Sequence, residues 1–397
     1  MRLSYEELNE IKKKFGVDQL WSFSKFDAYR TSQYEWMLKY LEHLPENHEQ
    51  QSAYASLGGE VHDILEGLYD GSVKYENMLS MFENVWNANI YVAQLVFDRT
   101  DESKNEKIQN KYYSSLVHFF KNYQKLPYKM QNEQFVTIKI TDDIVMQGYI
   151  DAVYKNEEGI YTIIDYKTST KYSGKKIEEH AAQLVLYSEA LRQLGVPKDK
   201  IRCGWNFLKY VDIDCEQMNG KIKTRTIERY EIGEKLQASV KAWLKKLKYD
   251  DEQAKEYLLK LIDSNDINCL PDDVKSKYTI KDCYVYVENI WDFYETLKEE
   301  IIETIAEINE KVEEYKCLMA IGDKEGAEKL FWDDEESLED QAYYYNNLCG
   351  YNIPTIKPYK QYLDKITAEK EGNIFGGTKQ SAEEDFAEDD MSWLNDL

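Results

Sequence analysis

The chain has 397 residues and a formal net charge of −24, and hydrophobic residues make up 43% of it. A chain of this length can bury the core of one elaborated domain or of two. No segment approaches the roughly 18–20 apolar residues of a membrane span, and the charged N-terminus lacks the apolar centre of a signal peptide, so we expect a cytoplasmic protein. The negative charge argues against an extensive, sequence-independent grip on nucleic acid, but it says little about a local groove.

The N-terminal third of the chain has the pattern of helices. Residues 5–15 are amphipathic and end at Gly16, which suits the left-handed position after a helix. The next segment, 21–44, predicts one helix capped by Ser24. Residues 74–125 hold two further helical runs with aromatic side chains at helical spacing, and we interpret most of these as core.

The segment 55–71 predicts a helix with one apolar side. His62 and Glu66 are four residues apart within it and therefore face the same way. Taken alone, a histidine on such a helix is more often a surface or core residue than a metal ligand. The two readings of His62 stay open at this point.

The centre of the chain predicts a β-hairpin. Residues 146–154 and 160–170 are β-rich runs joined by a tight Asn-Glu-Glu-Gly connection. Because side chains alternate along a strand, Asp165 and Lys167 project to the same side, and the tyrosine between them to the other. If the two strands pair antiparallel, Asp151 lies near Asp165. Glu133, on the strand before the hairpin, is interpreted as structural.

A helix over 181–191 follows, in which Gln183 and Tyr187 are four apart and share one face. Two ionised carboxylates held close repel each other, and a divalent metal ion with oxygen ligands is their natural compensation. A lysine beside such an ion can orient a water molecule or offset charge that develops on a phosphate. These residue types therefore predict a metal-dependent site.

The ordered set of Asp151, then Asp165-Tyr166-Lys167, then Gln183-x-x-x-Tyr187 resembles the PD-(D/E)XK nuclease superfamily. The resemblance is to its RecB-type branch, which includes phage and CRISPR-associated RecB-like exonucleases. It implies an α/β fold, with a three-layer αβα restriction-endonuclease-like core, a mixed central sheet and added helical regions.

The resemblance also implies roles for single residues. A G-x-x-x-H-like motif with Gly58 or Gly59 makes His62 a ligand of the catalytic metal ion, Mg²⁺ or Mn²⁺. The implied metal ligands are His62, Asp151, Asp165 and the carbonyl group of Tyr166. The implied catalytic residues are Asp151, Asp165, Lys167, Gln183 and Tyr187. Lys167 would position the attacking water, and Glu66 either supports the metal ligands or is a solvated residue.

Iron–sulfur members of this branch carry a Cys-Pro pair in the N-terminal motif, where this chain has Ser32 and Gln33. The usual downstream trio of closely spaced cysteines is also missing. Because such a cluster needs four thiolates at suitable spacing, we expect no iron–sulfur cluster. The six cysteines are scattered, which is typical of free thiols in a reducing compartment.

The loop after the hairpin is basic, and Lys171, Lys175 and Lys176 are candidates for binding a DNA backbone. A flexible, solvated loop is an equal alternative. Residues 201–211 and 223–232 predict two more strands. Beyond them the pattern becomes helical, with a long apolar stripe between 284 and 319 that predicts a long helix on the core.

We divide the chain into four parts. These are an N-terminal helix (1–19), a nuclease core (20–232), a helical region (233–365) and an acidic tail expected to be disordered (366–397). The end of the tail sets apolar residues among acids, which suits either a docking peptide for a protein partner or an inert solubilising tail.

The function that we predict is that of a metal-dependent DNA nuclease, an exonuclease or a nuclease that processes single strands or ends. DNA replication, recombination or repair, in a phage or a low-GC bacterium, would be its setting, in the bacterial or host cytoplasm. One alternative is a catalytically inactive nuclease-fold subunit that binds DNA or assembles through its helical region and tail. The other is a non-nuclease scaffold with a structural metal.

Overall fold

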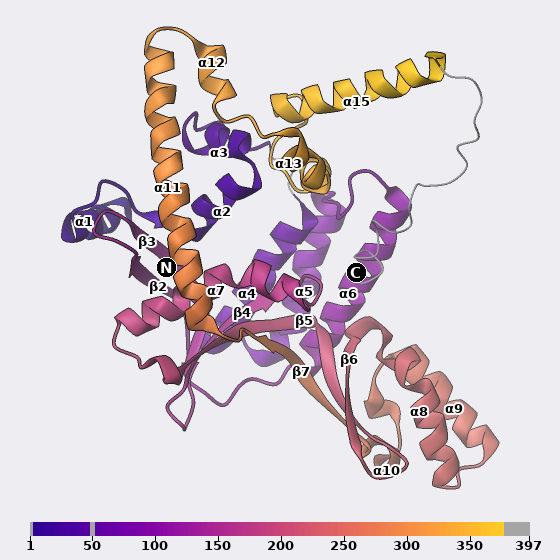
Figure 1. Cartoon of the computed structure of the whole chain (residues 1–397). Helices are drawn as coiled ribbons and strands as arrows, with labels where there is room; N and C mark the ends of the chain where they lie inside the picture. Colours follow the sequence, from indigo (N-terminus) through magenta and orange to yellow (C-terminus); the bar gives the residue numbers. More distant parts are fainter. Residues whose placement is uncertain (1–2, 48–51, 377–397) are drawn as a thin grey trace.

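The computed structural model describes residues 3–47 and 52–376 (Figure 1). Within this part of the chain, seven strands form one mixed sheet. The strands are β1 (Trp21–Ser22), β2 (Met130–Lys139), β3 (Val145–Lys155), β4 (Tyr161–Lys167), β5 (Ile201–Glu216), β6 (Ile222–Glu228) and β7 (Tyr278–Tyr286).

The sheet is built around two central strands, β3 and β5. Strand β3 pairs antiparallel with β2 and β4 and parallel with the short β1. Strand β4 runs parallel to β5, and β5 pairs antiparallel with β6 and β7. The predicted hairpin of β3 and β4 and the two further predicted strands, β5 and β6, are therefore confirmed.

Helices cover both faces of the sheet, which gives three layers (Figure 1). On one face, α2, α3, α7 and α11 share a core with the strands. On the other face, α4, α5 and α6 form a second core. A third core holds α8 and α9 against the outer ends of β5, β6 and β7. The helices introduced here are α2 (Phe23–Thr31), α3 (Gln33–Tyr40), α4 (Ala53–Asp70), α5 (Met78–Trp86), α6 (Glu102–Asn122), α7 (Lys175–Gln193), α8 (Ile232–Lys246), α9 (Asp251–Ser264) and α11 (Ile290–Ala320).

Smaller helices complete the chain. They are α1 (Tyr5–Phe15), α10 (Asp272–Lys275), α12 (Lys324–Lys329), α13 (Glu335–Asp340), α14 (Ala342–Asn347) and α15 (Lys357–Gly376). Helix α1 ends at Gly16 in the left-handed conformation, with φ of 73°, as the sequence predicts. None of the described helices is both long and apolar enough to cross a membrane.

The helix predicted over 21–44 is two helices, and this prediction was wrong in its details. Ser22, not Ser24, caps α2 by accepting a hydrogen bond from the backbone N–H of Lys25. Ser32 is extended, with φ of −156°, and caps α3 with its side chain. The Ser32 hydroxyl also donates to Asp333 at 2.8 Å, so a tertiary contact fixes the break.

The region beyond residue 233 is not all helix, which corrects the prediction for 233–365. Strand β7 lies in it and joins the central sheet beside β5. The predicted long helix is confirmed as α11, whose apolar stripe is buried against the core. Helix α15 continues to Gly376 and so extends into the region predicted as the acidic tail. Residues 377–397, with the predicted docking peptide, lie outside the described residues.

Candidate active site

Three elements bring the predicted metal ligands together. Helix α4 supplies His62, β3 supplies Asp151 and β4 supplies Asp165. One ligand atom from each side chain lies within 4.8 Å of the others. Helix α4 is held in place because Ser52 caps its start and its apolar side is buried against the sheet. The antiparallel register, in which Ala152 faces Ile164, sets Asp151 beside Asp165.

His62 bridges the two strands with both of its ring nitrogens. Its Nδ1 lies 3.4 Å from Oδ2 of Asp151. Its Nε2 lies 2.5 Å from the backbone carbonyl oxygen of Tyr166. The structure therefore brings the four predicted metal-ligating groups to one place. The Tyr166 ring packs in the core on the α4 side of the sheet, opposite to the neighbouring charged side chains.

Lys167 is an ion-pair partner of this centre. Its Nζ donates to Oδ2 of Asp165 at 2.8 Å. The other oxygen of Asp165, Oδ1, is buried and has no hydrogen-bond partner among the described residues. A buried carboxylate oxygen without a partner costs free energy, and a divalent cation would satisfy it. Carboxylate oxygens, a carbonyl oxygen and an imidazole nitrogen form a donor set that suits such a cation.

The charges of the centre act on one another. Burial raises the pKa of the Asp151 carboxyl, and the neighbouring charge of Asp165 raises it further. Burial alone would lower the pKa of Lys167, but the carboxylates of Asp165 and Asp151 outweigh it and hold that pKa above its ordinary value. The ionised form of Asp151 is thus disfavoured beside Asp165, and a bound cation would stabilise both carboxylates.

Gln183 and Tyr187 lie beside the centre on α7. The Gln183 amide donates to the Tyr187 hydroxyl at 3.1 Å. The Tyr187 ring lies against Gly148 of β3, where an added Cβ would meet the ring carbon Cε1 at 2.6 Å and the hydroxyl at 2.8 Å. Burial and the charge of Asp151 raise the Tyr187 pKa, so this hydroxyl stays protonated at neutral pH. Gly148 is thus required for the tyrosine to approach the sheet.

Two glutamates stand at the edge of the centre. Burial and the charge of Glu133 raise the pKa of the Glu66 carboxyl. Glu133, interpreted above as structural, lies between Asn132 and Gln134, which pair with the two neighbours of Asp151, and it has a positive φ of 46°. The sequence could have indicated this position, because Glu133 and Asp151 are equally distant from Asp142, which lies in the connection between β2 and β3. Neither glutamate belongs to the three-residue cluster.

The three candidate DNA-binding lysines lie at the start of α7 and in the loop before it. Lys175 and Lys176 are exposed. Lys171 is half-buried, and its Nζ donates to the hydroxyl of Thr226 on β6 at 3.2 Å. The structure therefore holds the Lys171 side chain against β6. Lys175 and Lys176 are the first residues of α7, the helix that carries Gln183.

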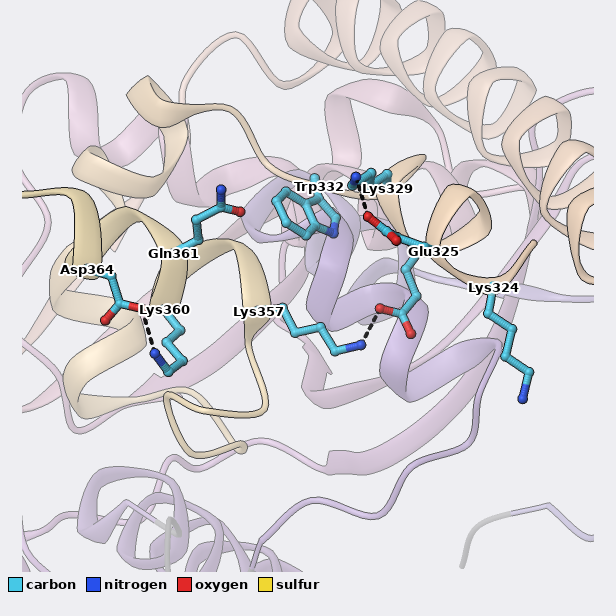
Figure 2. Close-up of a pocket in the computed structure, with 9 residues that line it drawn as sticks. Lys324, Glu325, Lys329, Trp332, Lys357, Lys360, Gln361 and Asp364 are labelled. Carbon is cyan, nitrogen blue, oxygen red and sulfur yellow. Dashed lines mark hydrogen bonds and ion pairs between the residues drawn. The ribbon is translucent and has the colours of Figure 1, made fainter. Parts of the chain in front are cut away.

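A different, charged pocket of about 710 Å³ lies between α12 and α15, and Figure 2 shows the side chains that line it. Three of its four lysines, Lys329, Lys357 and Lys360, are ion-paired with carboxylates of the pocket. Lys329 pairs with Glu325 at 2.6 Å, and Lys360 pairs with Asp364 at 2.6 Å (Figure 2). Lys357 is paired in the same way with Glu328. Such a lining, with three carboxylates beside four ammonium groups, does not select one charge of ligand.

A mixed sheet between two helical layers, with the charged centre on adjacent strands, is the arrangement of an α/β restriction-endonuclease-like fold. The sequence model of the PD-(D/E)XK nuclease superfamily matches residues 20–313, and the chain belongs to that superfamily. Its members are in general hydrolytic nucleases that use divalent metal ions. A search of curated proteins finds no match. The superfamily predicted from the sequence is thus confirmed.

Proposed function

We propose that the protein is a Mg²⁺- or Mn²⁺-dependent deoxyribonuclease that hydrolyses phosphodiester bonds at the His62–Asp151–Asp165 centre. The observation that carries the proposal is the convergence of these three side chains with Lys167, whose ammonium is ion-paired to Asp165. Superfamily membership supports the reaction class. The RecB-like branch, an exonuclease or end-processing mode, and a role in phage or bacterial DNA replication, recombination or repair rest on the sequence motifs.

The metal ion would be held by His62, Asp151, Asp165 and the Tyr166 carbonyl. When bound, it would supply Lewis acidity and a nucleophilic water at neutral pH. Lys167, fixed by Asp165, would orient the attacking water and offset charge on the phosphate.

Residues of α7 would hold the substrate next to this centre. Gln183 and Tyr187, joined by their hydrogen bond, would orient Lys167 or the scissile strand. Lys171, Lys175 and Lys176 would contact phosphates on the approach to the centre. Phosphate contacts of this kind position a strand without reading its sequence.

The test is cleavage of end-labelled single- and double-stranded DNA with Mg²⁺, Mn²⁺ or EDTA. Wild type is compared with Asp165→Ala and Lys167→Ala. The chain offers a matched control, the ion pair of Asp214 and Lys281 that joins β5 to β7. We expect metal-dependent products that Asp165→Ala and Lys167→Ala each reduce by about 10²–10³-fold, while Asp214→Ala and Lys281→Ala cleave like wild type.

The pattern of products would also report the polarity of an exonuclease. Wild-type protein that is folded but cleaves none of these substrates would refute the proposal. The catalytically inactive DNA-binding or assembly subunit would then be the better reading.

A further inference from the structure

Two aromatic rings stack near the N-terminal end of α7. Tyr172, in the loop before the helix, and His180 have ring centroids 4.2 Å apart and planes inclined by 21°. The core holds the tyrosine in place, because its ring packs edge-on against the rings of Trp205 and Phe207, with centroid distances of 5.2 Å and 5.0 Å. Both of these rings belong to the buried part of β5.

The His180 side of the stack is open. His180 is exposed, whereas Tyr172 is half-buried. Within the part of the chain that the structure describes, the His180 ring makes no hydrogen bond and no ion pair, and Tyr172 is its stacking partner. The His180 ring rests on a tyrosine that the core holds in place, so its other face could accept a further ring without loss of much side-chain freedom.

The stack belongs to the same helix face as the residues beside the metal centre. Lys176, His180, Gln183 and Tyr187 follow one another at spacings of four, three and four residues, which puts them on one side of α7. Because a helix rises about 1.5 Å per residue, His180 precedes Gln183 by roughly 4.5 Å along the axis. His180 also lies close enough to Lys167 and Lys176 to interact with their charges.

The chemistry of this position suits an unpaired nucleobase. Every base has a π-face, so stacking tolerates any sequence, but the faces are covered in a duplex. Lys176, one turn before His180, offers an ammonium group to the adjoining phosphate. Partial desolvation of the ring lowers the His180 pKa; Glu179 and Asp27 oppose this shift, and Lys167 and Lys176 add to it, which favours the neutral ring at neutral pH.

We propose that Tyr172 and His180 form a stacking platform for an unpaired base next to the scissile phosphate, so that the site takes single-stranded DNA or a frayed end. This inference rests on the proposed nuclease function, and it specifies the form of DNA that the site binds. The competing interpretation is that the two rings only cover Trp205 and Phe207.

The experiment is an abasic scan. Labelled single-stranded oligonucleotides, each with one base replaced by an abasic residue, are titrated with the full-length protein in Ca²⁺ instead of Mg²⁺. For wild type we expect one position at which loss of the base weakens binding by roughly 5- to 100-fold. His180→Ala should bind the intact strand that much more weakly and show no effect of the abasic residue at that position. His180→Phe should restore both the affinity and the dependence on position.

Three controls separate stacking from a structural effect. Duplex binding should be equal for wild type and His180→Ala, and thermal unfolding should show that the exposed position does not affect folding. Tyr5→Ala, which removes an exposed ring of α1, should leave the scan unchanged. An unchanged scan in His180→Ala, an equal loss on duplex DNA, or no binding of single strands by wild type would each overturn the platform. If wild type still cleaves DNA in a metal-dependent way, only the platform fails and the nuclease proposal stands.

Discussion

Replacing Asp151 with asparagine tests whether the two carboxylates of the centre repel each other in the metal-free protein. Their ligand atoms lie within 4.8 Å of each other. Two unit charges at that distance repel by about 3.5 kcal/mol at an effective dielectric constant of about 20. The ammonium of Lys167 offsets part of this repulsion, since it lies 2.8 Å from Asp165 and attracts Asp151 as well. We therefore expect metal-free Asp151→Asn to be more stable than wild type by about 1–3 kcal/mol near pH 8.

The pH dependence of this difference has a definite sign. Burial and Asp165 raise the folded-state pKa of Asp151 above its ordinary value of 3.8. A carboxyl group with a raised folded-state pKa stabilises the protein fully below its unfolded pKa, and that stability is lost as the pH rises through the folded-state value. Wild type should therefore lose stability from about pH 4 upward through this transition, and Asp151→Asn should lack this loss.

Bound metal should reverse the order of stability, so that wild type becomes more stable than Asp151→Asn. A ligand that binds only the folded state stabilises it by about 2.7 kcal/mol at a free concentration of 100 times its Kd. Urea unfolding with EDTA and with Mg²⁺ or Mn²⁺ measures both effects, and Asp143→Asn, an exposed acid in the β2–β3 turn, is the control. If Asp151→Asn is less stable than wild type in EDTA, or gains the same stability from metal, the reasoning about this centre is wrong.

Three further predictions concern the surroundings of the site. Gly148→Ala should lower the free energy of unfolding by about 1–3 kcal/mol and slow cleavage, because the new methyl group meets the Tyr187 ring. Adding Tyr187→Ala should remove much of the stability loss caused by Gly148→Ala, and additive losses in urea unfolding would contradict the contact. Arg229→Met should cost about 3 kcal/mol in the same assay, because the half-buried carboxylate of Asp282, 2.7 Å from Nη2 of the buried Arg229, would lose its partner. A loss below about 1 kcal/mol would refute this. Deleting residues 380–397 should leave DNA cleavage unchanged and abolish recovery of a protein partner in a pull-down, and unchanged recovery would count against the docking peptide.

The β-hairpin and the charged residues on it could be predicted because both depend on local chemistry. Alternation along β3 and β4 places Asp165 and Lys167 on one side whatever the rest of the chain does. The short connection then sets Asp151 beside Asp165. The same local logic gave the Gln183–Tyr187 pair, since four residues make about one helical turn.

His62 could not be predicted as a ligand from its own helix. Its contact with the Tyr166 carbonyl spans 104 residues, and nothing in the local pattern of α4 separates this histidine from a surface residue. The resemblance to the nuclease superfamily supplied that link. The break at Ser32 was missed for a related reason, because Asp333, 301 residues away, fixes it through a hydrogen bond that no local rule contains.

Strand β7 shows how tertiary pairing selects among local patterns. It lies between helical segments, in the region 233–365 that the sequence pattern predicts to be helical. Its pairing with β5 depends on Gly204, where an added Cβ would lie 2.4 Å from the carbonyl oxygen of Val285. The close approach of the two backbones is thus permitted by a glycine some eighty residues away, and only the folded sheet relates the two positions.

Net charge was the weakest guide to the site, and the distribution of charge along the chain explains why. The segment 167–176 carries four lysines and no acid, and it leads from the metal centre to the start of α7. Residues 377–397 carry seven acids and one lysine, which is a net charge of −6 out of −24. Since charges on a solvated surface are screened over about 10 Å at 0.1 M salt, a DNA strand bound at α7 would be influenced mainly by the nearby lysines and the His62–Asp151–Asp165 centre. The acidic composition of the chain is therefore compatible with a local, weakly basic path for a single strand.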